Sequence, residues 1–172
     1  MNQSSHTLKD KIQPLTELVK IRQKFKDLGK MVVFTNGVFD ILHRGHVEYL
    51  TQARELGDSL FVGLNSDTSV EKVKGPGKPL VKQEDRAIVI AGLAAVDYVC
   101  FFEEETPQNI IQAIIPDILV KGGDYQIFEI VGRDIVEDNG GKVVTIPTIA
   151  GFSTSELSRR IARLVIEKEK KK

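Results

Sequence analysis

The sequence predicts an α/β fold in which helices cover both faces of a parallel β-sheet. Five short apolar runs suit buried strands, and stretches with helical periodicity separate them. The runs occupy residues 31–34, 59–64, 98–102, 118–120 and 142–146. Such alternation of strands and helices is typical of a doubly wound sheet with right-handed crossovers. We therefore expect a Rossmann-like five-stranded parallel sheet, preceded by one extra N-terminal helix.

Composition and charge limit the classes of protein to which the chain can belong. A length of 172 residues suits one domain, and a formal net charge of zero gives no basic field for nucleic acid. No apolar stretch approaches the roughly 20 residues that span a bilayer, and no signal-peptide pattern opens the chain. The single cysteine, Cys100, suits a buried thiol in a reducing compartment. We expect a cytoplasmic protein that binds neither nucleic acid nor a membrane.

The N-terminal region suits an amphipathic helix. Residues 8–28 carry apolar side chains at helical spacing among lysines, with a break near Pro14. This helix could pack on the sheet, on a second subunit or on a membrane surface, although interspersed acidic residues disfavour the membrane. We divide the chain into an N-terminal extension (residues 1–30), a main domain (residues 31–167) and a disordered basic tail (residues 168–172), and we expect a homo-oligomer.

The first strand leads directly into the stretch that carries most of the functional signal. Residues 35–37 interrupt the apolar run of residues 31–34, and a helical pattern begins after Gly45. His43 and His46, three residues apart at the start of this helix, lie on one side of it and can face one anion. The carboxyl end of a parallel strand beside a helix N-terminus is the usual ligand crevice and attracts phosphate.

Two imidazoles suit the chemistry of nucleotidyl transfer. Their N–H groups can stabilise charge that builds on an α-phosphate and on leaving pyrophosphate, without forming permanent salt bridges. Gly45 leaves room for close approach of the backbone to a ligand. A metal site and an ordinary helix surface are the alternative interpretations of His43 and His46. The lack of a suitably placed cysteine or third histidine disfavours the metal.

Polar residues also follow the second and fourth strands. Asp67 could accept a hydrogen bond from a substrate hydroxyl, or it could only cap the next helix. After the fourth strand, two glycines permit close backbone approach, so Lys121 or Asp124 could contact a nucleotide or an acceptor. A plain tight turn is the alternative there. Both positions lie at strand carboxyl ends, where ligands bind in such sheets.

A lysine-rich segment, residues 71–82, is interrupted by glycine and proline, and we expect an irregular loop. Lys72 and Lys74 could clamp a triphosphate as this loop closes, and a solvated turn is the alternative. Arg86 lies in the first turn of the next helix, residues 84–95, where a cation is unfavourable for the helix dipole. A phosphate partner or a neighbouring carboxylate would offset this cost, and we favour the phosphate.

The sequence of the last third of the chain indicates two more helices. Residues 126–138 suit a helix with Gly132 inside it, and residues 156–166 suit the final helix. Ser153 opens a capping box at the start of the final helix. The hydroxyls of Ser153 and Thr154 at this helix N-terminus could also hold the distal phosphates of a nucleotide.

These motifs resemble those of a known enzyme superfamily. HRGH, at residues 43–46, is similar to the HxGH signature of nucleotidyltransferases, and TNGVFDILH, at residues 35–43, resembles the cytidylyltransferase-like branch. Further similarity, in the same order over roughly three quarters of the chain, lies in GLNSD, KGPGKPL, EDRAIVIAGL, VDYV, LVKGGDY and FSTSEL. The combination resembles the adenylyltransferase family of ADP-heptose synthesis. Ser155 departs from the second threonine that is common there, but it keeps the hydroxyl.

The resemblance implies transfer of AMP from ATP to D-glycero-β-D-manno-heptose 1-phosphate, with release of pyrophosphate and with Mg²⁺ bridging the phosphates. The acceptor phosphate is already ionised, so alignment and charge stabilisation suffice without a strong base. The implied catalytic residues are His43, His46, Lys74 and Arg86. The implied nucleotide-binding residues are Thr35, Asn36, Gly37, Phe39, Gly45, Lys72, Gly122, Asp124, Ser153 and Thr154. The implied acceptor-binding residues are Asp40, Asp67 and Lys121.

Two other functions stay open at this point. A cytidylyltransferase for glycerol 3-phosphate or a similar alcohol phosphate would share the histidine motif, and the choice of base is poorly encoded in side chains. A non-catalytic nucleotide-binding scaffold would keep the fold without the reaction. Many members of the resembled family carry a fused sugar kinase, and we expect another protein to supply that step here.

Overall fold

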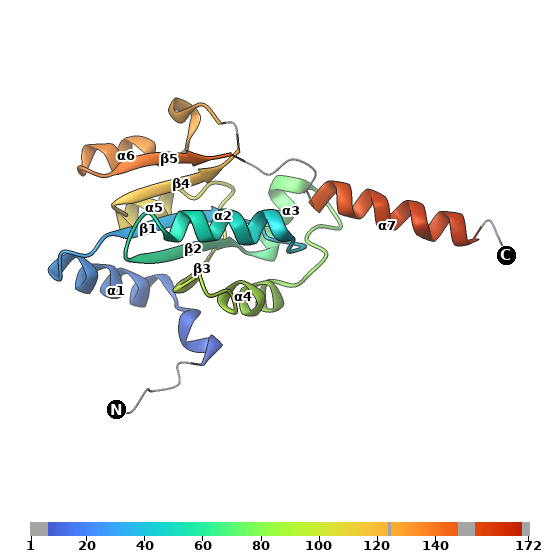
Figure 1. Ribbon diagram of the computed structural model, residues 1–172, viewed down its shortest axis with the longest axis horizontal. Helices are drawn as coiled ribbons and strands as arrows, with labels where there is room; N and C mark the ends of the chain where they lie inside the picture. Colours follow the sequence, from blue (N-terminus) through green and yellow to red (C-terminus); the bar gives the residue numbers. More distant parts are fainter. Residues whose placement is uncertain (1–6, 124, 148–153, 170–172) are drawn as a thin grey trace.

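A parallel sheet forms the centre of the fold, in a computed structural model that describes residues 7–123, 125–147 and 154–169 (Figure 1). Its five strands lie in the order β3-β2-β1-β4-β5, all parallel, which confirms the predicted doubly wound arrangement. The strands are β1 (Val32–Gly37), β2 (Ser59–Asn65), β3 (Tyr98–Phe102), β4 (Ile118–Gly122) and β5 (Lys142–Ile146).

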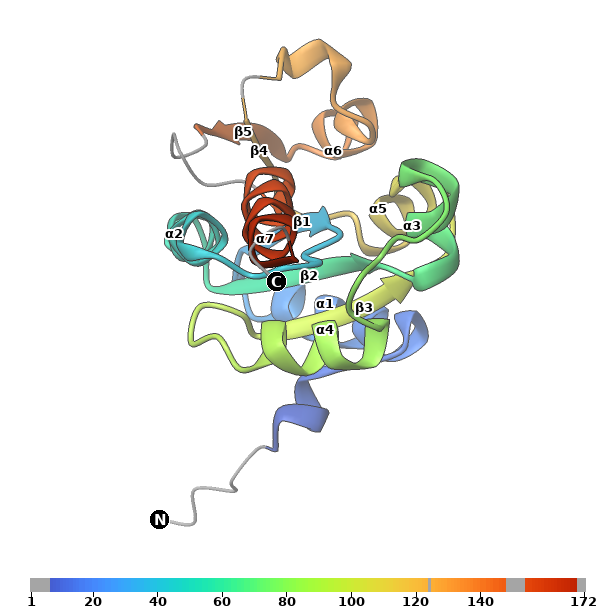
Figure 2. The ribbon, with the colours of Figure 1, turned by 90° about the vertical axis from the view of Figure 1, so that its right-hand side faces the viewer.

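Helices cover both faces of this sheet (Figure 2). The α-helices are α1 (Leu15–Asp27), α2 (Arg44–Arg54), α3 (Asp67–Lys74), α4 (Gln83–Ala91), α5 (Gln108–Ile114), α6 (Arg133–Asp138) and α7 (Thr154–Glu169). Two 3₁₀ turns span Leu8–Lys11 and Ile127–Glu129. Helices α2 and α4 pack on one face of the sheet, and α1, α5 and α6 pack on the other. None of the described helices is long and apolar enough to cross a membrane.

Alternating side chains of the strands supply two separate apolar cores. On β1, Val33 packs with α2 and α4, whereas Val32 and Phe34 pack with α1 and α5. Because both faces are covered, all three side chains are fully buried, and such strands appear in the sequence as continuous apolar runs. The parallel register pairs Val33 with Leu60 on β2 and with Ile118 on β4. The carboxyl ends of the strands therefore meet at one edge of the sheet.

Helix α1 belongs to the second of these cores. Its Leu18 is fully buried among side chains of the sheet and of α5. Arg22 donates a hydrogen bond to the carbonyl of Ile115 (3.1 Å) and forms an ion pair with Asp117 (2.8 Å). The predicted break is confirmed, because Pro14 stands between the first 3₁₀ turn and α1. The helix thus packs on its own sheet, which is one of the three alternatives considered above.

The expectation of an irregular loop over residues 71–82 is wrong for the first part of that segment, which belongs to α3. Ser66 caps the helix, because its side chain accepts a hydrogen bond from a backbone N–H in the first turn (3.1 Å). The helix ends where Gly75 adopts a φ of 87°, a conformation that glycine tolerates. Lys72 and Lys74 therefore lie on the last turn of a helix.

Other helix boundaries also differ from the expectation. The helix predicted over residues 126–138 is a 3₁₀ turn followed by α6, because Gly132 takes a φ of 86° and precedes α6 instead of lying inside a helix. The helix predicted over residues 84–95 ends earlier, at Ala91. The last helix begins before and ends after its predicted bounds, and its predicted capping residue, Ser153, lies outside the described residues.

Candidate active site

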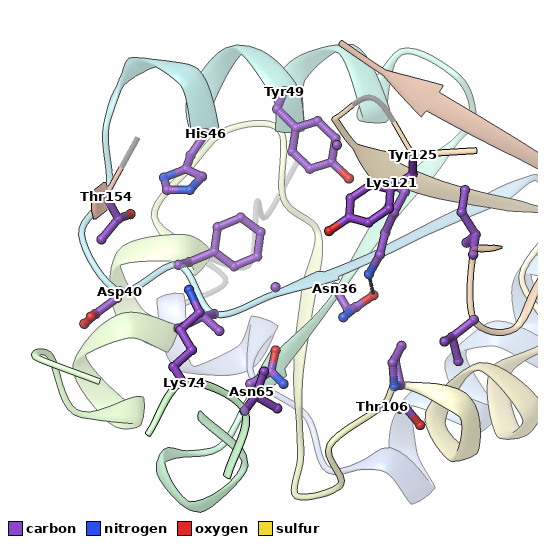
Figure 3. Close-up of a pocket in the computed structure, with 18 of the residues that line it drawn as sticks. Asn36, Asp40, His46, Tyr49, Asn65, Lys74, Thr106, Lys121, Tyr125 and Thr154 are labelled. Carbon is purple, nitrogen blue, oxygen red and sulfur yellow. Dashed lines mark hydrogen bonds between the residues drawn. The ribbon is translucent and has the colours of Figure 1, made fainter. Parts of the chain in front are cut away.

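A cavity of about 790 Å³ opens at the carboxyl ends of the strands (Figure 3). The predicted site residues that line it are Asn36, Gly37, Phe39, Asp40, His43, Gly45, His46, Lys74, Lys121, Gly122 and Thr154. His46 and Thr154 lie at one end of the view in Figure 3, and Lys121 and Thr106 lie towards the other. The sheet topology explains this gathering, because strands that run parallel deliver their following residues to one edge.

The two histidines form a stacked pair at the start of α2. His43 is the residue that precedes the helix, and its carbonyl accepts a hydrogen bond from the backbone N–H of His46 (2.9 Å). The ring centroids are 3.8 Å apart and the ring planes differ by 22°. The prediction that both imidazoles lie on one side of the helix start is thus confirmed, and both line the cavity.

The surroundings of the pair favour neutral imidazoles. Burial, together with the smaller effects of the nearby His43 and Lys74, lowers the pKa of His46 to about 4. Burial also lowers the pKa of His43. The Nδ1 atom of His46 is buried and has no hydrogen-bond partner among the described residues. At neutral pH the pair can therefore donate N–H groups without carrying charge, as the sequence-based interpretation requires.

Two lysines place positive charge on the cavity wall. Lys74 projects from the last turn of α3, and Lys121 projects from the end of β4. The Lys121 ammonium donates a hydrogen bond to Oδ1 of Asn36 on the neighbouring strand (2.6 Å), which is the dashed line in Figure 3. Burial lowers the pKa of Lys121 to about 8. An anionic ligand would supply the charge partner that this half-buried ammonium lacks in the described chain.

Asp40 holds the segment that precedes α4. Its Oδ1 atom accepts hydrogen bonds from the backbone N–H groups of Leu80 (2.8 Å) and Val81 (2.9 Å), and Lys78 lies 3.7 Å from its Oδ2 atom. Asp40 is nearly buried and borders the cavity. Its contacts tie the end of the β1 segment to the approach to α4.

Arg86 does not line the cavity. The residue is 1% exposed, and its side chain donates hydrogen bonds to the carbonyls of Val81 (2.9 Å), Val38 (2.7 Å) and Asn65 (3.0 Å). Its Nη2 atom also forms an ion pair with Oδ1 of Asp67 (2.7 Å). We had expected a phosphate to compensate for the unfavourable position of the Arg86 cation at a helix N-terminus. Backbone carbonyls and a carboxylate from another helix provide this compensation instead.

The other predicted residues divide into two groups. Thr35, Asp67 and Lys72 do not line the cavity. Thr35 is fully buried, and Asp67 is engaged by the ion pair described above. Asp124 and Ser153 lie outside the described residues.

Tyr49 is a cavity residue that the sequence analysis did not identify. Its hydroxyl lies 2.5 Å from Oγ1 of Thr35 and donates a hydrogen bond to the carbonyl of Val120 (3.2 Å). A side chain at Gly122 would come within 3.1 Å of the Tyr49 ring, so the glycine leaves room for the aromatic residue. Tyr49 follows His46 by three positions on α2, so both side chains lie on the same side of the helix. This spacing was the signal in the sequence that could have identified Tyr49 as a cavity residue.

Several further wall residues were also not identified as site residues, and they lie at a strand end, on α3 or in segments that follow strands. They are Val38, Asn65, Val73, Glu105, Thr106, Pro107, Tyr125, Glu129, Ile130, Val131 and Pro147. Most belong to segments without a recognisable motif, and their position after a strand end was the only indication available from sequence. Among the described residues, no group of three or more histidine, cysteine, aspartate or glutamate side chains could hold a metal ion.

The chain matches one protein family and a set of curated proteins. Residues 34–163 match the family described as cytidylyltransferase-like. The chain is 53% identical over 133 residues to the bifunctional protein HldE of Trichlorobacter lovleyi, covering 77% of this chain and 27% of that protein. It is 52% identical over 156 residues to the bifunctional protein HldE of Campylobacter concisus, covering 91% of this chain and 31% of that protein. The chain thus spans about three tenths of the length of these relatives.

Two solved structures share the fold. The lipopolysaccharide core biosynthesis protein of Thermoplasma volcanium is 28% identical with a TM-score of 0.58, over 70% of this chain and 98% of that chain. The pantoate–β-alanine ligase of Francisella tularensis has the same TM-score at 15% identity, over 86% of this chain and 75% of that one, and this likeness concerns the fold alone. Because the family match extends over residues 34–163, the chain belongs to the cytidylyltransferase-like family.

Proposed function

We propose that the protein transfers AMP from ATP to D-glycero-β-D-manno-heptose 1-phosphate and releases pyrophosphate, in the synthesis of ADP-heptose for lipopolysaccharide or another surface glycan. The observation that carries the proposal is the stacked pair of His43 and His46 on the wall of the cavity. The ADP-heptose motifs and the similarity to proteins named HldE support the acceptor. The name "bifunctional" fits relatives that join a domain like this one to a second activity.

The reaction is an in-line displacement at phosphorus. An oxygen of the acceptor phosphate forms a bond to the α-phosphorus of ATP, and the bond from that phosphorus to the bridging oxygen of pyrophosphate breaks. Pyrophosphate leaves with the electron pair. His43 and His46 donate N–H groups to the charge that develops at the α-phosphate and on the leaving group, where preorganised donors stabilise a transition state.

Other side chains of the cavity position the two substrates. Lys74 and Thr154 lie at the histidine end, where they suit the distal phosphates. Lys121 and Asn36 lie on neighbouring strands away from that end and suit the acceptor phosphate. The remaining proposed nucleotide contacts are Gly37, Gly45, Gly122, Asp124 and Ser153.

Magnesium enters this scheme as part of the ATP substrate. The described residues provide no cluster of ligands for a resident ion, whereas Mg²⁺ commonly binds nucleotide phosphates and keeps several of its waters. When it is bound, the ion neutralises charge on the phosphates. The chain's contribution is to hold the phosphates with lysines, hydroxyls and histidines.

A homo-oligomer is also proposed. Helix α7 carries Ile161, Leu164 and Ile166, each about half exposed, and Figure 1 shows the helix extending away from the sheet. A second copy of the chain could cover these residues. Light scattering of the purified protein measures the mass in solution, and a monomeric mass at micromolar concentration would contradict this proposal.

A glycerol-3-phosphate-type cytidylyltransferase is the second candidate, favoured by the description of the matched family. Pyrophosphate release by the purified protein separates the two, with ATP or CTP tested against the heptose phosphate or glycerol 3-phosphate in the presence of Mg²⁺. Release with ATP and the heptose phosphate alone is the expected result. Release with CTP and glycerol 3-phosphate would change the assigned substrates but leave the assigned site unchanged. ATP binding without release from any pair would support a non-catalytic scaffold.

A further inference from the structure

Phe39 has an unusual backbone conformation for a bulky side chain. It lies directly after Val38 in the segment between β1 and α2, and its φ is 48°. A left-handed conformation is strained for an L-residue, and aromatic residues rarely adopt it. The ring is also 6% exposed, so it is held inside the protein. Such local strain persists only where surrounding contacts impose it.

Contacts on both sides of Phe39 impose this conformation. On one side, the carbonyl of Val38 accepts a hydrogen bond from Nη1 of Arg86 (2.7 Å). On the other side, the carboxylate of Asp40 accepts two backbone hydrogen bonds from residues 80–81. We call residues 38–40, with these two sets of contacts, the clamped turn.

The clamp itself is rigid because Arg86 is fully engaged with the protein. Its other hydrogen bonds reach the carbonyls of Asn65 and Val81, and its ion pair reaches Asp67. These partners belong to the end of β2, the start of α3 and the segment before α4. A planar guanidinium with several donors can join segments in this way, whereas a lysine ammonium offers one point of charge on a flexible stem.

The strained residue directs its ring at His46. The centroids of the two rings are 5.3 Å apart and their planes meet at 69°, which is an edge-to-face contact. His46 is stacked on His43 at the same time. A side chain at Gly37 would come within 2.9 Å of the Phe39 ring, so the glycine permits the ring to occupy this place. The imidazole of His46 therefore contacts two rings, those of Phe39 and His43.

We propose that the clamped turn positions His46, with Phe39 and Arg86 as positioning residues and not as ligands of the nucleotide. The turn fixes the ring of Phe39, and the ring fixes the orientation and burial of the His46 imidazole. The statement that His46 then acts on a phosphate rests on the proposed function. The statement that Phe39 and Arg86 determine the environment of His46 does not depend on it.

The test uses the full chain, with histidine side chains observed by NMR. The variants are Phe39→Leu, which keeps an apolar side chain, and Arg86→Lys, which keeps the charge. The matched controls are Phe128→Leu, at an exposed aromatic residue, and Arg22→Lys, at a nearly buried arginine that pairs with a different aspartate.

We expect both test variants to change the His46 ring signals and to raise its pKa from about 4 towards the ordinary 6.5, because burial is the main cause of the low value. His43 and Lys74 face His46 and remain present in all variants. We also expect kcat to fall at least about 10-fold while the Kd of ATP changes less than about 3-fold, as for misplacement of a catalytic group. Neither control should have these effects.

Two results would overturn the proposal. Unchanged His46 signals and pKa in both test variants would show that the turn is only structural. A weaker ATP affinity with unchanged kcat in Arg86→Lys would make Arg86 a nucleotide ligand. If Arg86→Lys does not fold, Phe39→Leu carries the test, because it leaves the hydrogen bonds of Arg86 in place. A wild-type protein without transferase activity would refute the proposed function, but the NMR comparison would still decide the role of the turn.

Discussion

At the scale of single residues, burial determines the charge states in the cavity. His46 and Lys121 both have pKa values well below their ordinary ranges, because each side chain loses water on folding. The consequence differs between the two. His46 is neutral at pH 7 and is available as an uncharged donor, whereas Lys121, with a pKa of about 8, is still mostly protonated there. Modest alkalinity is therefore sufficient to remove the positive charge of Lys121.

This difference predicts a pH dependence that originates from Lys121. Below about pH 8 its ammonium can attract an anionic substrate, and above that pH the neutral amine cannot. We expect kcat/KM of the wild-type protein to fall as the pH rises from 7 to 9, because this ratio follows ionisations of the free enzyme. In Lys121→Arg the guanidinium stays charged, so the ratio should stay flat over the same range. Initial rates across this range provide the measurement, and parallel profiles would contradict the assignment.

The residue scale also shows which site features sequence can predict. The pairing of His43 and His46 follows from a spacing of three on one helix, so local periodicity was sufficient. The ion pair of Arg86 with Asp67 joins residues on two different helices, and only the packed fold brings them together. Sequence reasoning located both residues, but it could not determine that each is the partner of the other.

At the scale of elements, apolar runs located the strands correctly. The polar residues and glycines that follow two of these runs led us to place the ends of those strands too early. The runs at 98–102 and 142–146 coincide with β3 and β5. Strand β1 continues through residues 35–37, and β4 continues through residues 121–122, although these residues are polar or glycine. Strand pairing uses backbone groups, so a polar side chain at a ligand site does not end a strand.

Gly132 offers a prediction at this scale, because it directly precedes α6 and has a φ of 86°. A side chain there would also come within 2.6 Å of Ile111 on α5. We expect Gly132→Ala to lower the free energy of unfolding by about 3 kcal/mol, from backbone strain and overpacking together. Gly140 has a φ of 81° but open space around it, so Gly140→Ala should cost about 1 kcal/mol. Urea denaturation measures both values, and equal losses would show that the contact with Ile111 costs nothing.

At the scale of the whole molecule, the N-terminal helix is packed into the same core as the sheet. Leu18 of α1 is fully buried, whereas Leu28, which follows α1, is 71% exposed. We expect Leu18→Ala to lower the free energy of unfolding by about 3 kcal/mol, because a buried leucine leaves a cavity. Leu28→Ala, the matched control, should change it by less than about 0.5 kcal/mol. Chemical denaturation decides this, and a small loss for Leu18→Ala would mean that α1 is an independent extension.

The whole fold also explains why the site lies where it does. A parallel sheet brings the ends of its strands to one edge, and the described cavity residues come from the ends of strands and from the helices and segments that follow them. The sequence was sufficient to predict a cavity at the carboxyl ends of the strands, because this inference does not require the order of the strands in the sheet. The residues supplied by segments without motifs, such as Thr106 and Ile130, required the structure.

The central claim is that the stacked histidines carry out nucleotidyl transfer, and His46→Ala tests it most directly. The measurement is the single-turnover rate of pyrophosphate formation from ATP and the heptose phosphate, with ATP affinity measured in parallel. Gln52→Ala, at an exposed position of the same helix, is the control. We predict that His46→Ala lowers the rate at least about 100-fold with little change in ATP affinity, as for loss of a transition-state donor. A rate within a few-fold of the wild-type and control values would contradict the account.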